Sequence, residues 1–183
     1  VPEPDFLRKT LPFLEDPGVA AVQTLWGHLN ADYSQITRAQ SVVLDGINYV
    51  IQSAQCWSGV MMHFQGTAGV WRRSAIDDAG GWQADTLTED LDLSYRAQIR
   101  GWRLKFLPQV LCPGELPPTI AAAKTQQHRW VKGGFQTARK LLPSIMKSGL
   151  SPLAKAEAAY HMVALALTPA VLVMAVSWPL QIW

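Results

Sequence analysis

Two clusters of polar side chains carry the residue types that could act on a substrate. The first is the acidic run Thr88-Glu89-Asp90-Leu91-Asp92, and the second is Gln126-Gln127-His128-Arg129-Trp130. A carboxylate at a helix start beside a glycine-rich strand can act as a general base for a hydroxyl nucleophile. Arginine offers a planar fork of donors for phosphate oxygens, and an indole face offers a stacking surface for a ring.

Each cluster also has a purely structural interpretation. Helices commonly begin with threonine followed by acidic residues, because the first-turn N–H groups and the helix dipole favour negative charge. On a helix, Gln126, Arg129 and Trp130 share one face through their i,i+3 and i,i+4 spacing. That face can equally be an interfacial tryptophan beside an arginine that reaches into lipid headgroups. Neither cluster decides between chemistry and structure when it is taken alone.

The elements that position these clusters begin with a helix and a strand. Residues 5–14 can form a short helix capped by Asp5. Gly18 then introduces the apolar run VAAVQT, which is suited to a buried strand. Residues 33–62 are rich in apolar side chains, and we expect them to be helical. The segment FQGTAGVWR at 64–72 is typical of a strand, with glycines where a ligand or another backbone could come close.

The acidic cluster lies in a second group of elements. Residues 74–79 form a helical turn that ends at Gly80-Gly81, and Thr88 then caps a helix to about Arg100. Gly101 ends this helix, and WRLKFLPQVL predicts a further strand. Strands that alternate with helices indicate an α/β layer structure.

Composition and charge divide the chain into three parts. Of its 183 residues, 49% are hydrophobic and 16% charged, which excludes a disordered chain. Residues 1–115 are acidic, with nine basic and thirteen acidic residues, whereas 116–156 hold seven basic residues and no acidic one. After Glu157 no charged residue follows. The small net charge of +2 therefore hides an acidic body, a basic collar and an uncharged tail.

The tail, residues 158–183, is 26 residues without Lys, Arg, Asp or Glu. About 20 apolar residues of helix span the hydrocarbon core of a bilayer, so the tail predicts a transmembrane helix, although a buried helix of a large soluble domain is an alternative. Pro169 is tolerable in such a segment. The collar beside it would stay in the cytoplasm by the positive-inside rule, and its helix, predicted at 121–146 and broken at Pro143, could lie along anionic headgroups.

Two other kinds of site are disfavoured. A basic stretch can bind nucleic acid, but no helix-turn-helix, RNP or zinc pattern accompanies it. Cys56 and Cys112 lack CxxC spacing and are expected to be reduced, buried thiols, and the scattered histidines suggest no zinc site.

In order along the chain, FQGTAGVWR, TEDLDLS and QQHRW ahead of an apolar helix resemble the second half of a family 2 glycosyltransferase of the cellulose synthase-like type. The resemblance covers about residues 4–183. FQGTAG, GELPPT and QQHRW look similar to the branch that makes mannan or β-1,4-glucan backbones. The resemblance implies a membrane-bound inverting enzyme that moves a sugar from a nucleotide-sugar donor, UDP-glucose or GDP-mannose, to a growing polysaccharide.

The resemblance also implies roles for particular residues. Asp90 would be the general base that deprotonates the acceptor hydroxyl, with Glu89 and Thr88 positioning it. Gln126, Arg129 and Trp130 would form a lid over the site, in which Arg129 meets the donor pyrophosphate and Trp130 stacks on the terminal acceptor sugar. The acceptor pocket would be lined by residues of the glycine-rich segment, namely Phe64, Gly66 and Thr67.

One departure from the family pattern concerns the donor. The family holds Mg²⁺ or Mn²⁺ on the diphosphate through a DxD motif, a task suited to carboxylate oxygens. By resemblance these ligands are expected upstream of Val1, and Asp5 is expected to be a helix cap and no metal ligand. We therefore expect this chain to be part of a longer enzyme and to be inactive alone.

The sequence thus predicts an α/β fold, a partial Rossmann-like GT-A domain followed by an interfacial helix and a transmembrane helix. Residues 1–117 would be the acceptor half of the catalytic domain, 118–150 the interfacial helix and 151–183 the transmembrane part. The location would be the cell membrane, the inner one in a bacterium, with the catalytic part in the cytoplasm and no nucleic-acid partner. Two alternatives are a non-processive transferase with a lipid acceptor and a catalytically silent, membrane-anchored domain that binds polysaccharide or serves as a scaffold.

Overall fold

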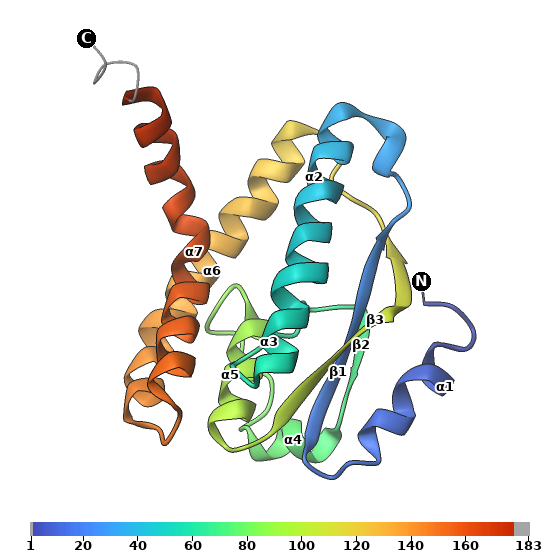
Figure 1. The fold of residues 1–183 in the computed structure, drawn as a ribbon, viewed down its shortest axis with the longest axis vertical. Helices are drawn as coiled ribbons and strands as arrows, with labels where there is room; N and C mark the ends of the chain where they lie inside the picture. Colours follow the sequence, from blue (N-terminus) through green and yellow to red (C-terminus); the bar gives the residue numbers. More distant parts are fainter. Residues whose placement is uncertain (1, 178–183) are drawn as a thin grey trace.

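A three-stranded mixed sheet stands at the centre of the fold (Figure 1). The computed structural model describes residues 2–177, and the side chains of 165–176 lie outside that description. The middle strand, β1 (Val19–His28), runs parallel to β3 (Arg103–Gly114) and antiparallel to the short β2 (Gly69–Trp71). The order β2-β1-β3 confirms an α/β fold with a mixed sheet.

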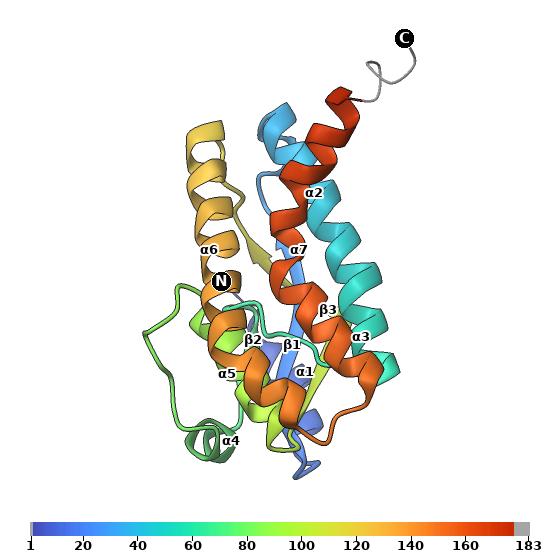
Figure 2. The same ribbon diagram turned by 90° about the vertical axis from the view of Figure 1, so that its left-hand side faces the viewer.

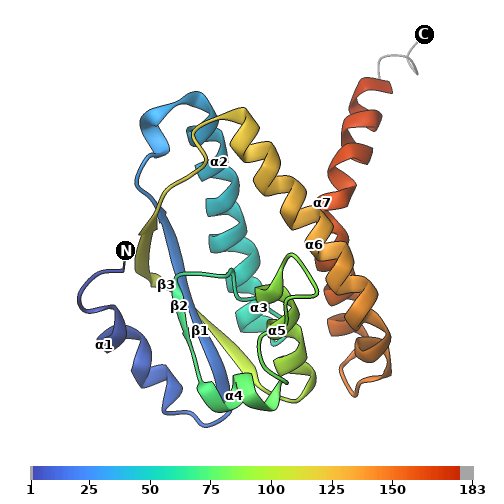
Figure 3. The same ribbon diagram turned by 180° about the vertical axis from the view of Figure 1, so that it is seen from behind.

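Helices cover both faces of the sheet and add an outer layer on one side. The first helix, α1 (Phe6–Thr10), precedes β1. Between β1 and β2 lie α2 (Gln35–Gly46) and α3 (Ser53–Ser58), and between β2 and β3 lie α4 (Arg73–Asp78) and α5 (Glu89–Ile99). After β3 come α6 (Ile120–Lys147) and α7 (Pro152–Ser177). Figure 3 shows α1 on one side of the sheet and α2, α3, α6 and α7 on the other. A π-helical stretch at Ile47–Gln52 joins α2 to α3, so the helix predicted over 33–62 is largely confirmed.

The central strand is buried from Val19 to Leu25 because both of its faces are covered. On one face Val19 and Val22 pack with Phe6 of α1, and on the other Ala21 and Leu25 pack with residues of α4 and α5. A strand that is buried on both sides has a continuous apolar sequence. The strand predicted from VAAVQT is therefore confirmed.

A third apolar cluster joins the two long C-terminal helices to α5. Leu91 and Tyr95 of α5 pack with Leu141 and Ile145 of α6, and α7 contributes Met162. Figure 2 shows α6 and α7 as neighbouring helices in front of the sheet. The helix that begins with the acidic cluster, α5, is therefore packed against both α6 and α7.

Three local predictions were wrong in detail. Only the last residues of the predicted strand 64–72 pair with the sheet, because Gly66 (φ 78°) and Ala68 (φ 57°) have left-handed backbone and turn the chain. Asp5 does not cap α1, since its carboxylate pairs with Nζ of Lys9 at 2.7 Å. Thr88 precedes α5, but its hydroxyl makes no capping bond.

The helix predicted to break at Pro143 is also continuous. α6 runs from Ile120 through Pro143 to Lys147. Proline removes one backbone hydrogen bond from the helix. Leu141 and Ile145 are buried on either side of it, and their packing against the neighbouring helices holds both segments in line.

The predicted transmembrane helix is not confirmed. Within residues 2–177, no helix combines the length and the apolar character needed to cross a bilayer. The first turns of the uncharged run are used in packing, because Ala158 and Met162 are buried and Tyr95 Oη lies 2.9 Å from Nδ1 of His161. Residues 178–183, and the side chains of 165–176, fall outside the described part of the chain.

Both cysteines are free thiols, as predicted. Cys112 is buried in β3 and Cys56 is half-buried in α3.

Candidate active site

The carboxylate of Asp90 lies in the first turn of α5, and the residue is half-buried. Its Oδ1 accepts a hydrogen bond from the backbone N–H of Leu91 at 2.8 Å. Burial raises the pKa of Asp90 to about 6; the Leu91 N–H opposes this rise, the Glu89 carboxylate adds to it and the Arg129 guanidinium opposes it weakly. A carboxylate with a pKa near neutrality suits proton abstraction at physiological pH.

The glycine-rich segment lies directly against this carboxylate. A Cβ atom built at Gly66 would stand 2.7 Å from Oδ2 of Asp90, and the positive φ of 78° also favours glycine. At Gly69 a Cβ would collide with the backbone carbonyl of Val22. The predicted close approach of another backbone is confirmed at Gly69, whereas at Gly66 the close neighbour is a side chain, the candidate base Asp90.

Two buried polar residues of β1 hold the segment in place. Nε2 of Gln23 donates to the carbonyls of Thr67 and Ala68, both at 3.1 Å, and its Oε1 accepts from the N–H of Gln65 at 2.9 Å. The hydroxyl of Thr24 donates to the Ala68 carbonyl at 2.8 Å. Sequence reasoning missed both residues. The available signal was a polar Gln-Thr pair inside a run expected to be fully buried.

Ser94 links the same segment to α5. Its hydroxyl donates to the backbone carbonyl of Asp90 at 2.6 Å and accepts from the N–H of Phe64 at 2.8 Å. Phe64 itself is buried in the core, and its ring meets that of Trp71 edge to face at 5.5 Å. The buried ring of Phe64 therefore anchors the glycine-rich segment to the core, whereas Thr67 is exposed.

Thr88 connects the start of α5 to α6. Its Oγ1 lies 3.2 Å from Oγ1 of Thr137, and both residues are buried. A Cβ at Gly133 would stand 2.5 Å from Cγ2 of Thr88, and one at Gly134 would stand 2.5 Å from the carbonyl of Met162 on α7. The two glycines therefore let α6 approach the acidic cluster on one side and α7 on the other.

The last acid of the cluster, Asp92, has a structural role. It is fully buried and pairs with Nη2 of Arg96 at 2.7 Å and with Nζ of Lys140 at 2.9 Å. Lys140 also contacts Asp85 at 2.7 Å, and Arg96 donates to the carbonyl of Gly81 at 2.9 Å. This network ties the 79–87 loop to α5 and α6.

The second cluster lies on α6, and only part of it reaches the first. Arg129 is exposed and acts electrostatically on Asp90. Gln126 and Trp130 are half-buried on the same helix, but they do not line the pocket beside Asp90. The structure thus brings together Thr88, Glu89, Asp90, Gly66 and Arg129.

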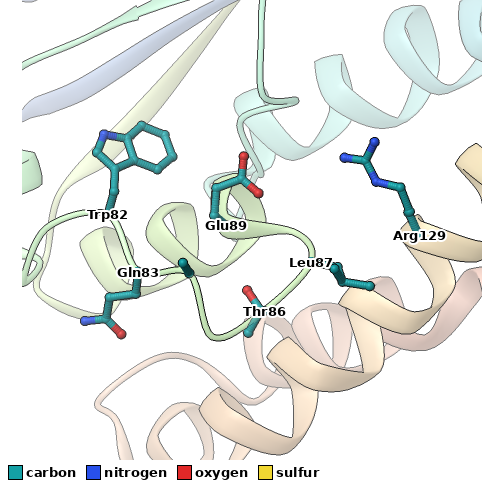
Figure 4. A pocket seen from close by; sticks show the side chains of 7 residues that line it. Trp82, Gln83, Thr86, Leu87, Glu89 and Arg129 are labelled. Atoms are coloured by element: carbon teal, nitrogen blue, oxygen red, sulfur yellow. The ribbon is translucent and has the colours of Figure 1, made fainter.

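An open pocket of ≈ 410 Å³ lies next to this group, between the loop before α5 and α6. Its wall is formed by Trp82, Gln83, Ala84, Thr86, Leu87, Glu89 and Arg129. Figure 4 shows Trp82 and Arg129 on opposite sides of Glu89. Trp82 was missed by the sequence analysis, and the only signal for it was its place after the glycine pair at 80–81.

The residues present do not fit a metal centre. Over the described part of the chain, no three of the His, Cys, Asp and Glu side chains are grouped so that they could hold a metal ion. Asp92, two residues after Asp90 in α5, already pairs with two cations, Arg96 and Lys140.

A half-buried carboxylate at the start of α5, beside an open pocket, is a chemically suitable arrangement for abstracting a proton from a hydroxyl. The model of the family described as glycosyl transferase family group 2 matches residues 1–183, and the chain belongs to this family.

Curated relatives agree with this assignment. Glucomannan 4-beta-mannosyltransferase 2 of Arabidopsis thaliana is 42% identical over 148 residues, which are 80% of this chain and 28% of that protein. Glucomannan 4-beta-mannosyltransferase 1 of Oryza sativa subsp. japonica is 43% identical over 148 residues, again 80% and 28%. The chain therefore spans less than a third of the length of these relatives.

A solved structure shares the fold. It is a mannosyltransferase from Pyrobaculum calidifontis in complex with GDP-Man and Mn²⁺, which superposes with a TM-score of 0.60 at 17% identity. The match covers all of this chain and 52% of the other.

Proposed function

We propose that the chain forms the acceptor side of a GT-A-type catalytic domain of an inverting hexosyltransferase, which extends a β-linked polysaccharide from a nucleotide-sugar donor. The observation that carries this proposal is the carboxylate of Asp90, whose pKa is raised to about 6 and which lies against Gly66 beside an open pocket. The names of the plant relatives favour mannose as the transferred sugar and a 1,4 linkage.

The proposed reaction has one proton transfer and one displacement. The ionised Asp90 takes the proton from an acceptor hydroxyl, and that oxygen forms a bond to the anomeric carbon of the donor. The bond between this carbon and the donor phosphate breaks, and its electron pair leaves with the nucleoside diphosphate. Attack from the face opposite the phosphate inverts an α-linked donor into a β-linked product.

The remaining residues of the site would orient the sugar and neutralise the negative charge of the leaving diphosphate. Arg129 is exposed at the pocket, where its guanidinium could meet the negative charge of the leaving diphosphate. Glu89 faces the same pocket and could accept hydrogen bonds from sugar hydroxyls. Thr88 acts on the base indirectly by anchoring the start of α5 to α6.

The other predicted residues keep roles that await a test. Trp130 and Gln126 are half-buried on α6, and stacking of Trp130 on the acceptor end remains a proposal from the resemblance. Thr67 is exposed beside Gly66 and is available to an acceptor, whereas Phe64 contributes through its buried ring.

Replacement of the base tests the mechanism. In the complete gene product, Asp90→Asn should reduce sugar transfer from GDP-mannose to β-1,4-mannan acceptors by at least about 10²-fold, the lower contribution of a general base. Asp77→Asn is the matched control, because Asp77 is an exposed carboxylate on α4 that does not line the pocket. Near-native transfer by the Asp90 variant would overturn the assigned role.

The membrane location is a separate proposal that rests on the sequence. The uncharged residues 158–183 follow a basic collar, a pattern that favours a segment inserted in a membrane with the collar on its cytoplasmic side. The complete gene product should then remain in the membrane fraction after alkaline carbonate washing, and its release into the supernatant would contradict this proposal.

A further inference from the structure

The pocket beside Asp90 has one wall that proton transfer does not require, and this wall is the indole of Trp82. We propose that the pocket is a sugar subsite in which one pyranose ring stacks on Trp82 while its hydroxyls bond to Glu89 and Arg129. This inference rests on the proposed function and assigns a specificity-determining residue to it.

Trp82 is presented to the pocket by a turn and held there by other rings. It follows Gly80 (φ 86°) and Gly81 (φ 75°), whose left-handed backbone turns the chain after α4. Its ring meets Trp71 edge to face at 6.0 Å, and Trp71 in turn meets Phe64 at 5.5 Å. Despite these contacts, 49% of Trp82 is exposed.

The indole of Trp82 contacts the Trp71 ring and is half-exposed, so part of its surface is available to stack on a sugar ring. The contact with Trp71 restricts its orientation before a ligand binds, so less side-chain freedom would be lost on binding than for an indole without such a contact. The apolar C–H face of a pyranose can cover the exposed indole area, and removal of that area from water is favourable.

Two charged residues that line the pocket, Glu89 and Arg129, are suited to bind the hydroxyl groups of a sugar ring. In the part of the chain that the structure describes, neither Glu89 nor Arg129 has an ion-pair partner, although both line the pocket. A free carboxylate accepts hydrogen bonds from hydroxyls, and a guanidinium donates them to hydroxyl oxygens. Gln83 is not available, because its amide accepts from Nζ of Lys140 at 2.6 Å and donates to the Gly80 carbonyl.

The size and place of the pocket agree with this occupant. A volume of ≈ 410 Å³ lies within the range of about 300–1,000 Å³ that is usual for small-molecule sites. Glu89 is the residue before the candidate base in α5, so the pocket lies at the same helix start, although Asp90 itself does not line it. A ring bound in this pocket can belong to the acceptor glycan or to the sugar of the donor.

The test compares Trp82→Ala, Trp82→Phe and the control Trp57→Ala in the complete gene product. Trp57 is 82% exposed on α3 and does not line the pocket, so its removal deletes a matched side chain elsewhere. The KM values for β-1,4-linked mannotetraose and for GDP-mannose are measured separately, together with kcat. Binding of mannotetraose is measured independently by saturation-transfer NMR, and circular dichroism confirms folding.

Trp82→Ala should raise one of the two KM values by about three- to tenfold, the size of an aromatic stacking contribution. Trp82→Phe should recover part of the loss, and Trp57→Ala should leave both values unchanged. A rise for mannotetraose assigns the ring to the acceptor, and a rise for GDP-mannose assigns it to the donor.

If the Trp82→Ala protein is folded and both KM values and its binding of mannotetraose are unchanged, the subsite is refuted. The proposed function is not refuted by that result, provided that the native protein transfers sugar. A fall in kcat alone would also overturn the subsite. If native protein transfers no sugar but mannotetraose binding still depends on Trp82, the proposed function fails and the subsite stands. Absence of both activities refutes both.

Discussion

The half-buried carboxylate of Asp90 should make the protein less stable above about pH 6 than below about pH 4, and its replacement by the neutral isostere should remove this penalty. Burial raises its pKa from an ordinary value of 3.8 to about 6. At 1.36 kcal/mol for each pKa unit, the ionised group destabilises the folded state by about 3 kcal/mol at most. Asp90→Asn keeps the oxygen that accepts from Leu91 N–H, so we expect a gain of about 2–3 kcal/mol at pH 8.

The sign of the pH dependence follows from the direction of the shift. Because the folded-state pKa is the higher one, the folded chain binds more protons than the unfolded chain between about pH 4 and pH 6. The stability associated with this group is fully present below about pH 4 and is lost as the pH rises through about 6. The advantage of Asp90→Asn should therefore disappear toward pH 3.5.

Denaturant unfolding of both proteins at pH 8 and pH 3.5 measures this directly. The other carboxyl groups titrate equally in both proteins, so they cancel in the difference. At pH 8 the thermal midpoint should rise by about 5–10 °C, since 1 kcal/mol shifts it by about 2–4 °C in a chain of this size. Asp77→Asn, at an exposed position, should show no such change.

A loss of stability on Asp90→Asn at pH 8, or a difference independent of pH, would refute the reasoning. Either result would mean that Asp90 is not held ionised at a cost to the fold. The gain in stability should accompany the loss of transfer, as expected where a functional group is kept in an unfavourable environment.

Three further substitutions test the packing around the base. Gly66→Ala should lower transfer strongly and destabilise the fold by about 1–2 kcal/mol, because a Cβ would stand 2.7 Å from Asp90 Oδ2 at a φ of 78°; kcat and thermal unfolding measure this. Gly133→Ala should destabilise by about 1–3 kcal/mol, since its Cβ would stand 2.5 Å from Thr88 Cγ2, and it should reduce kcat by displacing the start of α5. Asp92→Ala should destabilise by about 3–5 kcal/mol in denaturant unfolding, because two cations lose a buried partner.

A helical glycine with free space provides the control for these substitutions. No atom lies within 4 Å of a Cβ built at Gly46 in α2. Gly46→Ala should therefore stabilise the chain by about 0.5–1 kcal/mol and leave transfer unchanged. If Gly66→Ala or Gly133→Ala behaved like Gly46→Ala, the close contacts described around Asp90 and Thr88 would be wrong.

Local features of the chain were readable from the sequence. The apolar run at the start of β1, the glycine that ends α5 and the long amphipathic helix α6 each follow from side-chain pattern and backbone preference. The family was also readable, because its short motifs occur in the correct order. These signals depend on residues near one another in the chain.

Details that depend on contacts between distant residues could not be predicted from the sequence. Thr88 has the sequence of a helix cap, yet its hydroxyl bonds to Thr137, 49 residues away. The uncharged tail has the composition of a membrane helix, yet its first turns pack on α5 and α6. Local preference predicts the start or character of a helix, but it cannot tell which distant partner a side chain meets.

The sequence alone thus determined the order of the elements, the family and the identity of the candidate base. Only the tertiary structure placed Gly66 against Asp90, joined Gln23 to a loop 45 residues later and brought Trp82 to the pocket. The physical reason is that secondary structure follows from interactions within a few residues, whereas burial, pKa and pocket shape arise when distant segments exclude water together.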